Sequence, residues 1–272
     1  MIGAIAGDVV GSVYEFAPHK SIEFPLLQPG CDFTDDTVLT VATAHAILTG
    51  RTYGDCYLDF GRRYPGRGYG GSFLKWLRSE NPKPYGSYGN GSAMRVSPVG
   101  FAFDTAERVL EEAERSAAPT HDRPEGIKGA QAVALAVFRA RHGVPKAEIR
   151  REIEERFGYD LGRSVAAIRP TYRFDETCPG SVPEALIAFL EAESAEHAIR
   201  LAVSLGGDAD TQAAIAGPIA QAFHRDLPPE LVSGVRAVLP AEFLEIIDEF
   251  EARFSVAVEP CHARGRTPCR SE

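Results

Sequence analysis

The sequence predicts a single, all-helical domain, and three observations support this fold class. Apolar residues recur every three to four positions through most of the chain. Proline near the starts and glycine near the ends divide this pattern into separate segments. No run alternates long enough to build a sheet, and neither a linker nor an internal repeat interrupts the pattern. We therefore expect one domain over residues 1–254 and a mobile C-terminal tail over residues 255–272.

The helical pattern defines ten segments. In chain order they are an opening helix with Ile2, Ile5, Val9 and Val13 on one face, then 36–48, 104–118, 124–142, 147–157, 183–192, 195–205, 211–223, 229–238 and 241–254. Asp104, with Glu107 three residues later, forms a capping-box pattern at the third start. Gly158 caps the segment 147–157. Two short runs, 169–174 and 255–258, are the only candidates for extended structure.

Composition limits the classes of function. The chain has 272 residues, a net charge of −9 and 44% hydrophobic residues, so it is long enough to bury a core without disulfide or zinc staples. The negative charge argues against nucleic acid as a bulk partner. No apolar run reaches the roughly 20 residues of a membrane-spanning helix, and the first residues lack the basic flank of a signal peptide. We expect a cytoplasmic monomer.

The five cysteines do not form a metal or disulfide pattern. They include no C-x-x-C pair, so Cys31, Cys56 and Cys178 are interpreted as reduced thiols. Cys261 and Cys269 lie in the tail near a histidine, but their spacing matches no zinc site.

Two glycine-rich segments interrupt the helices: residues 66–72 (Gly-Arg-Gly-Tyr-Gly-Gly-Ser) and 85–92 (Tyr-Gly-Ser-Tyr-Gly-Asn-Gly-Ser). Backbone N–H groups without side-chain cover suit close approach to phosphates. Flexible loops between helices have the same composition. Composition alone leaves both interpretations open.

Two helix starts each carry two carboxylates and at least one threonine: residues 33–37 (Phe-Thr-Asp-Asp-Thr) and 206–211 (Gly-Gly-Asp-Ala-Asp-Thr). Capping explains one acceptor at each start. Two carboxylates about 4 Å apart, however, repel by roughly 4 kcal/mol at an effective dielectric constant near 20. The clusters therefore predict a cation. Hard oxygen ligands favour Mg²⁺, with Mn²⁺ and Ca²⁺ as alternatives, and four carboxylates balance two divalent ions.

The opening helix adds a third acidic element. Asp8, Ser12 and Glu15 recur at helical spacing opposite its apolar face, which is equally typical of a solvated surface. Gly7 and Gly11 cost helix stability and allow another segment to pack closely. His121 precedes a helix start, where an imidazole either contacts a bound phosphate or ribose or has an ordinary structural role.

Five motifs in order make the sequence resemble the ADP-ribosylglycohydrolase family, which includes the dinitrogenase reductase-activating glycohydrolases. The motifs are Gly7-Asp8-x-x-Gly11-Ser12-x-x-Glu15, Phe33-Thr34-Asp35-Asp36-Thr37, Tyr85 to Arg95, Thr120-His121 and Gly206-Gly207-Asp208-x-Asp210-Thr211. The resemblance covers residues 1 to about 254. It implies an orthogonal multi-helical bundle with two Mg²⁺ in a central cleft.

The resemblance also implies roles for individual residues. The metal ligands would be Thr34, Asp35, Asp36, Asp208, Asp210 and Thr211. The cradle for ribose and diphosphate would be Gly70, Gly71, Ser72, Gly86, Ser87, Tyr88, Asn90 and Gly91, with His121 at the diphosphate or distal ribose. Glu15 would be a mobile acid beside the scissile ribose. Ala209, as a non-ligand, should not disturb metal binding.

The expected activity is hydrolysis at the anomeric carbon of an ADP-ribose, releasing it from a modified protein side chain or a related conjugate. Two Mg²⁺ would hold the ribose hydroxyls, and a carboxylate would accept a proton from the attacking water. Glu15, Asp35 and Asp208 are the candidates for that proton acceptor, and the sequence leaves the choice open, as it does the acceptor linkage. The alternatives are a Mg²⁺-dependent phosphohydrolase, which would need parallel strands, and a noncatalytic ADP-ribose-binding or structural protein on the same fold.

Overall fold

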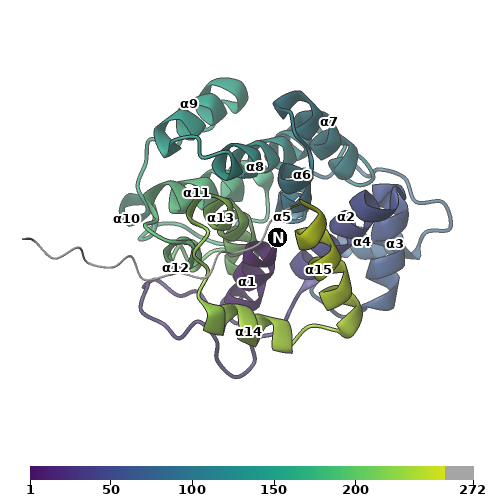
Figure 1. The fold of residues 1–272 in the computed structure, drawn as a ribbon, viewed down its shortest axis with the longest axis horizontal. Coiled ribbons are helices and arrows are strands. Elements are labelled where there is room, and N and C mark those ends of the chain that lie inside the picture. The colour runs from purple at the N-terminus through teal and green to yellow at the C-terminus, as the bar shows by residue number, and fades with distance from the viewer. Residues whose placement is uncertain (255–272) are drawn as a thin grey trace, which may run out of the picture.

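Every regular element in the computed structural model, which describes residues 1–254, is a helix (Figure 1). The helices are α1 Ile2–Gly11, α2 Asp35–Thr49, α3 Tyr53–Arg63, α4 Gly71–Arg78, α5 Gly91–Met94, α6 Ser97–Ala102, α7 Ala106–Ala117, α8 Pro124–Arg141, α9 Lys146–Phe157, α10 Val165–Ile168, α11 Cys178–Glu191, α12 Ala195–Val203, α13 Ala209–His224, α14 Pro229–Ala237 and α15 Ala241–Phe254. This described part contains no strand, and Gly89 and Thr177 form an isolated antiparallel bridge. The all-α prediction is confirmed.

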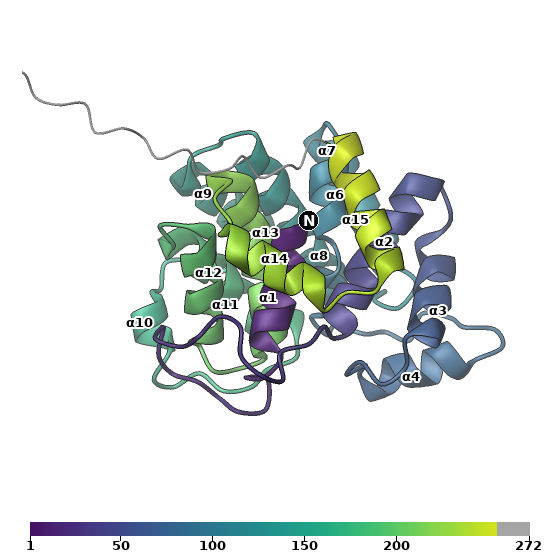
Figure 2. The same ribbon diagram turned by 60° about the horizontal axis from the view of Figure 1, so that its bottom comes forward.

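Two buried helices, α1 and α13, form the centre of the domain. α1 is buried along its whole length, and α13 is buried from Ala209 to Ala222. They pack against each other, and α13 also contacts α8, α11 and α12. In Figures 1 and 2, α2, α3 and α4 lie on one side of this pair and α10, α11 and α12 on the other.

Glycines on α1 set the distance between the two central helices. A Cβ atom at Gly7 would overlap the backbone of Ala213, and one at Gly11 would lie 2.6 Å from the backbone nitrogen of Asp210. A contact of that length is incompatible with a side chain. The close packing expected beside Gly7 and Gly11 is therefore present, and it places α1 against the acidic start of α13.

The predicted extension of the opening helix through Val13 and Glu15 is wrong, and of the two interpretations left open for its polar face, the structure excludes the solvated surface at Asp8. α1 ends at Gly11, so Val13 and Glu15 lie in the turn and bend that follow the helix. Asp8, for which a solvated face was an open alternative, is fully buried.

Two predicted helix starts also differ. α7 is capped by Thr105, whose hydroxyl accepts from the Arg108 backbone nitrogen at 3.2 Å, because the Asp104 side chain faces solvent and pairs with Arg141. α11 begins at Cys178 rather than at Pro183, because the Thr177 hydroxyl caps it.

Five helices were missed by the sequence analysis: α3, α4, α5, α6 and α10. Four of them span eight residues or fewer, which is too short for a periodic pattern.

Residues 169–174, a candidate for extended structure, form a turn followed by irregular chain, without a strand. The tail, the run 255–258 and the cysteine pair Cys261 and Cys269 lie outside the described residues. Within residues 1–254, no helix combines the length and apolarity that a membrane crossing requires.

Candidate active site

Carboxylates from three helices converge near the centre of the domain. Asp8 of α1, Asp36 of α2 and Asp210 of α13 offer oxygens that all lie within 4.8 Å of one another. A second trio, within the same limit, consists of Glu15, Asp208 and Asp210. Asp210 belongs to both trios, so the two acidic helix starts meet as one cluster.

Asp8 holds the start of α2 in place. Its Oδ2 accepts from the backbone nitrogens of Thr34 at 2.9 Å and Thr37 at 3.0 Å, and also from the Thr37 hydroxyl. Its Oδ1 accepts from the Thr34 hydroxyl at 2.7 Å. One carboxylate on α1 therefore satisfies free donors in the first turn of α2. The sequence analysis did not place Asp8 in the acidic cluster, although its position between two glycines of a buried helix was a usable signal.

The start of α13 is connected to α2 and to the second glycine-rich segment. The Thr211 hydroxyl donates to Asp36 Oδ2 at 3.2 Å, and the Thr211 backbone nitrogen donates to Asp210 Oδ1 at 2.9 Å. The Asn90 side-chain amide donates to Asp208 Oδ2 at 2.7 Å. These contacts fix the carboxylates relative to one another before any ligand binds.

Asp35 lies beside the cluster but in neither trio. Its backbone nitrogen donates to the carbonyl of Arg67 at 2.6 Å, and its carboxylate adjoins Gly68, where a Cβ atom would lie 3.2 Å from Oδ1. Asp35 therefore connects the start of α2 to the first glycine-rich segment, through Arg67 and Gly68.

Burial and mutual repulsion make the charged state of the cluster costly. Burial, followed by the charge of Asp210, raises the pKa of both Asp35 and Asp36 well above the usual range. Burial, followed by Asp208, does the same to the pKa of Asp210. Burial raises the pKa of Glu15 to about 8, with Asp210 and Asp8 adding to it, and that of Asp208 to about 6. Desolvation and like charges explain these directions.

The same residues fit a divalent cation. Asp36 Oδ1 is buried and has no hydrogen-bond partner among the described residues, although a buried carboxylate oxygen normally has one. The oxygen atoms around it belong to carboxylates and a threonine hydroxyl, which are the hard ligands that divalent cations such as Mg²⁺ prefer. A metal-binding acidic cluster is therefore present.

A cavity of about 410 Å³ opens over the cluster. It brings together almost all of the predicted site residues from both glycine-rich segments and both acidic starts: Glu15, Asp35, Asp36, Gly70, Gly71, Ser72, Gly86, Ser87, Tyr88, Asn90, Gly91, His121, Asp208, Asp210 and Thr211. Thr34 is absent from the lining because its hydroxyl is turned toward Asp8. Arg95, Phe174 and Glu176 also line the cavity, and none had been given a site role.

The glycine-rich segments are partly helical. Gly71 begins α4 and Gly91 begins α5, so each segment ends in a helix start rather than in a flexible loop. His121 is buried, with Nδ1 2.7 Å from the Thr120 hydroxyl oxygen.

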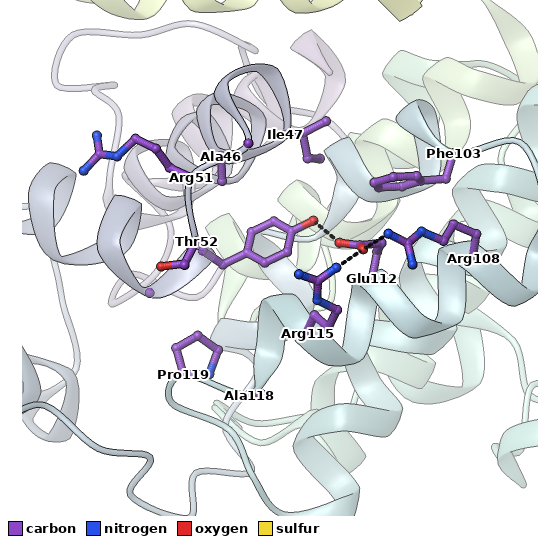
Figure 3. Close-up of a pocket in the computed structure, with 13 residues that line it drawn as sticks. Ala46, Ile47, Arg51, Thr52, Phe103, Arg108, Glu112, Arg115, Ala118 and Pro119 are labelled. Carbon is purple, nitrogen blue, oxygen red and sulfur yellow. Dashed lines mark hydrogen bonds and ion pairs between the residues drawn. The ribbon is translucent and has the colours of Figure 1, made fainter.

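A larger cavity, of about 660 Å³, lies between the α2–α3 junction and α7 (Figure 3). Its only carboxylate, Glu112, accepts from the Tyr53 hydroxyl at 2.8 Å and pairs with Arg108 at 2.6 Å and Arg115 at 2.5 Å. This network joins α3 to α7, and the remaining charged side chain of the cavity, Arg51, pairs with Asp59 at 3.2 Å. None of the predicted site residues lines the cavity. The candidate site is therefore the smaller, acidic cleft.

The described residues form an all-helical domain with a metal-binding acidic cleft. The sequence profile of the ADP-ribosylglycohydrolase family matches residues 1–259, and the chain belongs to this family. It is thus a hydrolase of ADP-ribosyl groups that acts on ADP-ribosylated substrates.

Similar proteins cover most of the chain. ADP-ribosylhydrolase ARH3 of Mus musculus is 27% identical over an alignment of 319 positions, and the alignment covers 82% of each chain. ARH3 of Homo sapiens is 26% identical and covers 85% of this chain and 86% of its own. ADP-ribosylarginine hydrolase Tri1 of Pseudomonas putida (strain GB-1) is 26% identical and covers 86% of this chain and 72% of its own.

A solved structure described as an ADP-ribosylglycohydrolase-related protein complex shares the fold. It has a TM-score of 0.66 at 26% identity, covering 94% of this chain and 93% of that chain.

Proposed function

We propose that this protein is a Mg²⁺-dependent hydrolase that cleaves the glycosidic bond at the anomeric carbon of ADP-ribose and frees ADP-ribose from a modified protein side chain or a related conjugate. The observation that carries this proposal is the convergence of Asp36, Asp208 and Asp210 beneath a cleft lined by two glycine-rich segments. Mn²⁺ is the alternative metal.

The metal would be held by the residues of the two acidic helix starts: Thr34, Asp35, Asp36, Asp208, Asp210 and Thr211. Two bound Mg²⁺ would supply positive charge that holds ribose hydroxyls and orients the attacking water. Asp8 is not proposed as a metal ligand, because its oxygens already accept four hydrogen bonds from Thr34 and Thr37. Its proposed role is to hold the start of α2 in position.

Glu15 is the proposed proton acceptor. It lies in the non-helical segment after α1, is partly buried, and lines the cleft beside Asp208 and Asp210. As water attacks the anomeric carbon, the bond from that carbon to the acceptor nitrogen or oxygen breaks, the water proton passes to the ionised carboxylate, and the departing nitrogen or oxygen takes up a proton in its place. Only an ionised carboxyl can accept this proton, and cations bound beside Asp208 and Asp210 would lower the pKa of Glu15 from its metal-free value of about 8. Asp35 and Asp208 are the other candidates.

The glycine-rich segments are the proposed cradle for ribose and diphosphate. Gly70 and Gly71 have open space where a side chain would stand, and a Cβ atom at Gly91 would make an ordinary van der Waals contact with the His121 ring, at 3.5 Å. Backbone N–H groups can therefore approach phosphate oxygens closely. Ser72, Gly86, Ser87, Tyr88 and Asn90 complete this cradle.

The acceptor linkage is tested with a panel of defined conjugates. ADP-ribosylarginine is the first to include, since Tri1 is named for it; ADP-ribosylserine and O-acetyl-ADP-ribose follow. We expect release of ADP-ribose from at least one conjugate in Mg²⁺ and its loss in EDTA. Asp210→Asn should be inactive, while Asp104→Asn, whose carboxylate is 95% exposed, should match the wild type.

Two outcomes would contradict the proposal. Activity that survives exhaustive chelation would exclude the metal role. Tight binding of ADP-ribose with no turnover on any conjugate would favour a noncatalytic binding protein. A phosphohydrolase would instead release inorganic phosphate, but its sheet architecture has no counterpart in residues 1–254.

A further inference from the structure

Arg95 is a buried cation without a carboxylate partner. Its side chain is fully buried and lines the candidate cleft. No carboxylate of the described residues lies within ion-pair distance of it, and its Nε has no hydrogen-bond partner there. The guanidinium lies 4.0 Å over the Tyr57 ring. Buried charges are normally paired, so a buried guanidinium without a carboxylate partner indicates a role other than an ion pair.

Arg95 orients the hydroxyl of Thr120. Its Nη2 donates to Thr120 Oγ1 at 2.8 Å and to the carbonyl of Ser116 at 3.1 Å. A threonine hydroxyl has one proton and two lone pairs. Because the guanidinium can only donate, it occupies one lone pair of Oγ1 and leaves the hydroxyl proton for another acceptor.

Two acceptors compete for that proton. His121 Nδ1 lies 2.7 Å from Oγ1, whereas the carbonyl of Ala117 lies 3.5 Å away. The shorter contact has the geometry of a strong O–H···N bond, and the longer one is at the limit for a hydrogen bond. Thr120 therefore donates to Nδ1, which must then be unprotonated.

The other ring nitrogen adjoins the second glycine-rich segment. A Cβ atom at Gly91 would lie 3.6 Å from His121 Nε2, and one at Gly89 would lie 3.9 Å from it. A neutral imidazole carries one proton, so a ring whose Nδ1 accepts from Thr120 carries it on Nε2, beside this segment. Burial and the Arg95 charge lower the pKa of His121 well below its usual range, so the ring is neutral.

We propose that Thr120, oriented by Arg95, is a positioning residue that holds His121 as the Nε2–H tautomer and so presents an N–H donor to the cleft. The ligand group at this point is then a hydrogen-bond acceptor, and the uncompensated positive charge of Arg95 favours an anionic one. Naming that group as a diphosphate or ribose oxygen rests on the proposed function; the tautomer does not.

The tautomer is measured directly by long-range ¹H–¹⁵N correlation NMR of the histidine rings in the wild-type protein, Thr120→Val and Thr120→Ser. His121→Asn assigns the signal among the seven histidines. We expect a neutral Nε2–H ring in the wild type and in Thr120→Ser, and an increased Nδ1–H fraction in Thr120→Val, which keeps the shape but loses the hydroxyl. An Nδ1–H ring in the wild type, or an unchanged ring in a folded Thr120→Val, would overturn the proposal. If the valine variant does not fold, the wild-type spectrum decides alone.

Calorimetry with ADP-ribose and Mg²⁺ tests the consequence for binding. Thr120→Val should weaken binding by about tenfold, the scale of one well-placed hydrogen bond, while Thr120→Ser should stay within about twofold. Equal weakening in both variants would indicate a packing role and contradict the proposal. Absence of ADP-ribose binding in the wild type would count against the proposed function, while the NMR spectrum would still decide the tautomer.

Discussion

Asp8 Oδ2 accepts hydrogen bonds from both the backbone nitrogen and the hydroxyl of Thr37, so a single carboxylate on α1 fixes the first turn of α2. The replacement Asp8→Asn should test this contact. An amide has one acceptor oxygen where the carboxylate has two, so buried donors lose their partners. We expect a loss of about 2–4 kcal/mol in the free energy of unfolding, measured by urea denaturation. A loss below about 0.5 kcal/mol, equal to that of the exposed control Asp104→Asn, would show that the contact contributes little.

Asp210→Asn should separate metal binding from stability. Asp210 is the carboxylate shared by both acidic trios, so its neutralisation removes repulsion in the metal-free protein as well as a ligand. We expect a melting temperature in EDTA equal to or above that of the wild type, and little further increase on adding Mg²⁺. Thermal melts with and without Mg²⁺ measure both quantities. Stabilisation by Mg²⁺ as large as in the wild type would remove Asp210 from the metal site.

The stability of the metal-free protein should depend on pH. Burial and like charges raise the pKa of Asp36 and Asp210 above the usual range, and that of Glu15 to about 8. A carboxyl with a higher pKa in the folded state contributes stability below its unfolded pKa, near 4, and this contribution is lost as pH rises through the folded pKa.

Stability in EDTA should therefore fall between about pH 5 and about pH 8. Saturating Mg²⁺ should flatten the decline, because the cation compensates the charged carboxylates. Melting temperatures across this range, in EDTA and in Mg²⁺, provide the test. A metal-free protein that becomes more stable over the same interval would contradict these pKa directions.

Glu15→Gln should affect the rate more than binding. Glu15 lies outside both acidic helix starts and lines the cleft beside Asp210, so the isosteric amide removes a proton acceptor and leaves the cradle in place. We expect ADP-ribose affinity within a few-fold of the wild type and turnover lower by roughly 10²- to 10⁴-fold. Calorimetry and a product-release assay measure the two effects. Turnover near the wild-type rate would transfer the proton-acceptor role to Asp35 or Asp208.

The sequence by itself determined the helical class and the two acidic starts. Both are local properties: α2 begins where Thr34 caps it, and α9 ends where Gly158 adopts the left-handed conformation. The residues that line the cleft were named from the resemblance of five ordered motifs to a known family, because composition alone left the glycine-rich segments open. Short helices such as α5 and α6 were not, because one turn gives no periodicity.

Tertiary structure decided which residues act together. Asp8 sits on a helix whose residues are all buried, and its role depends on Thr34 and Thr37, which approach it only when α1 and α2 pack. Arg95 reaches Thr120 across 25 positions of the chain, and no spacing rule connects them. Contacts between distant segments are set by side-chain packing over the whole core, whereas caps and periodicity are set within one or two turns. For this reason, sequence motifs could name most residues that line the cleft, but they could not name the groups that orient them.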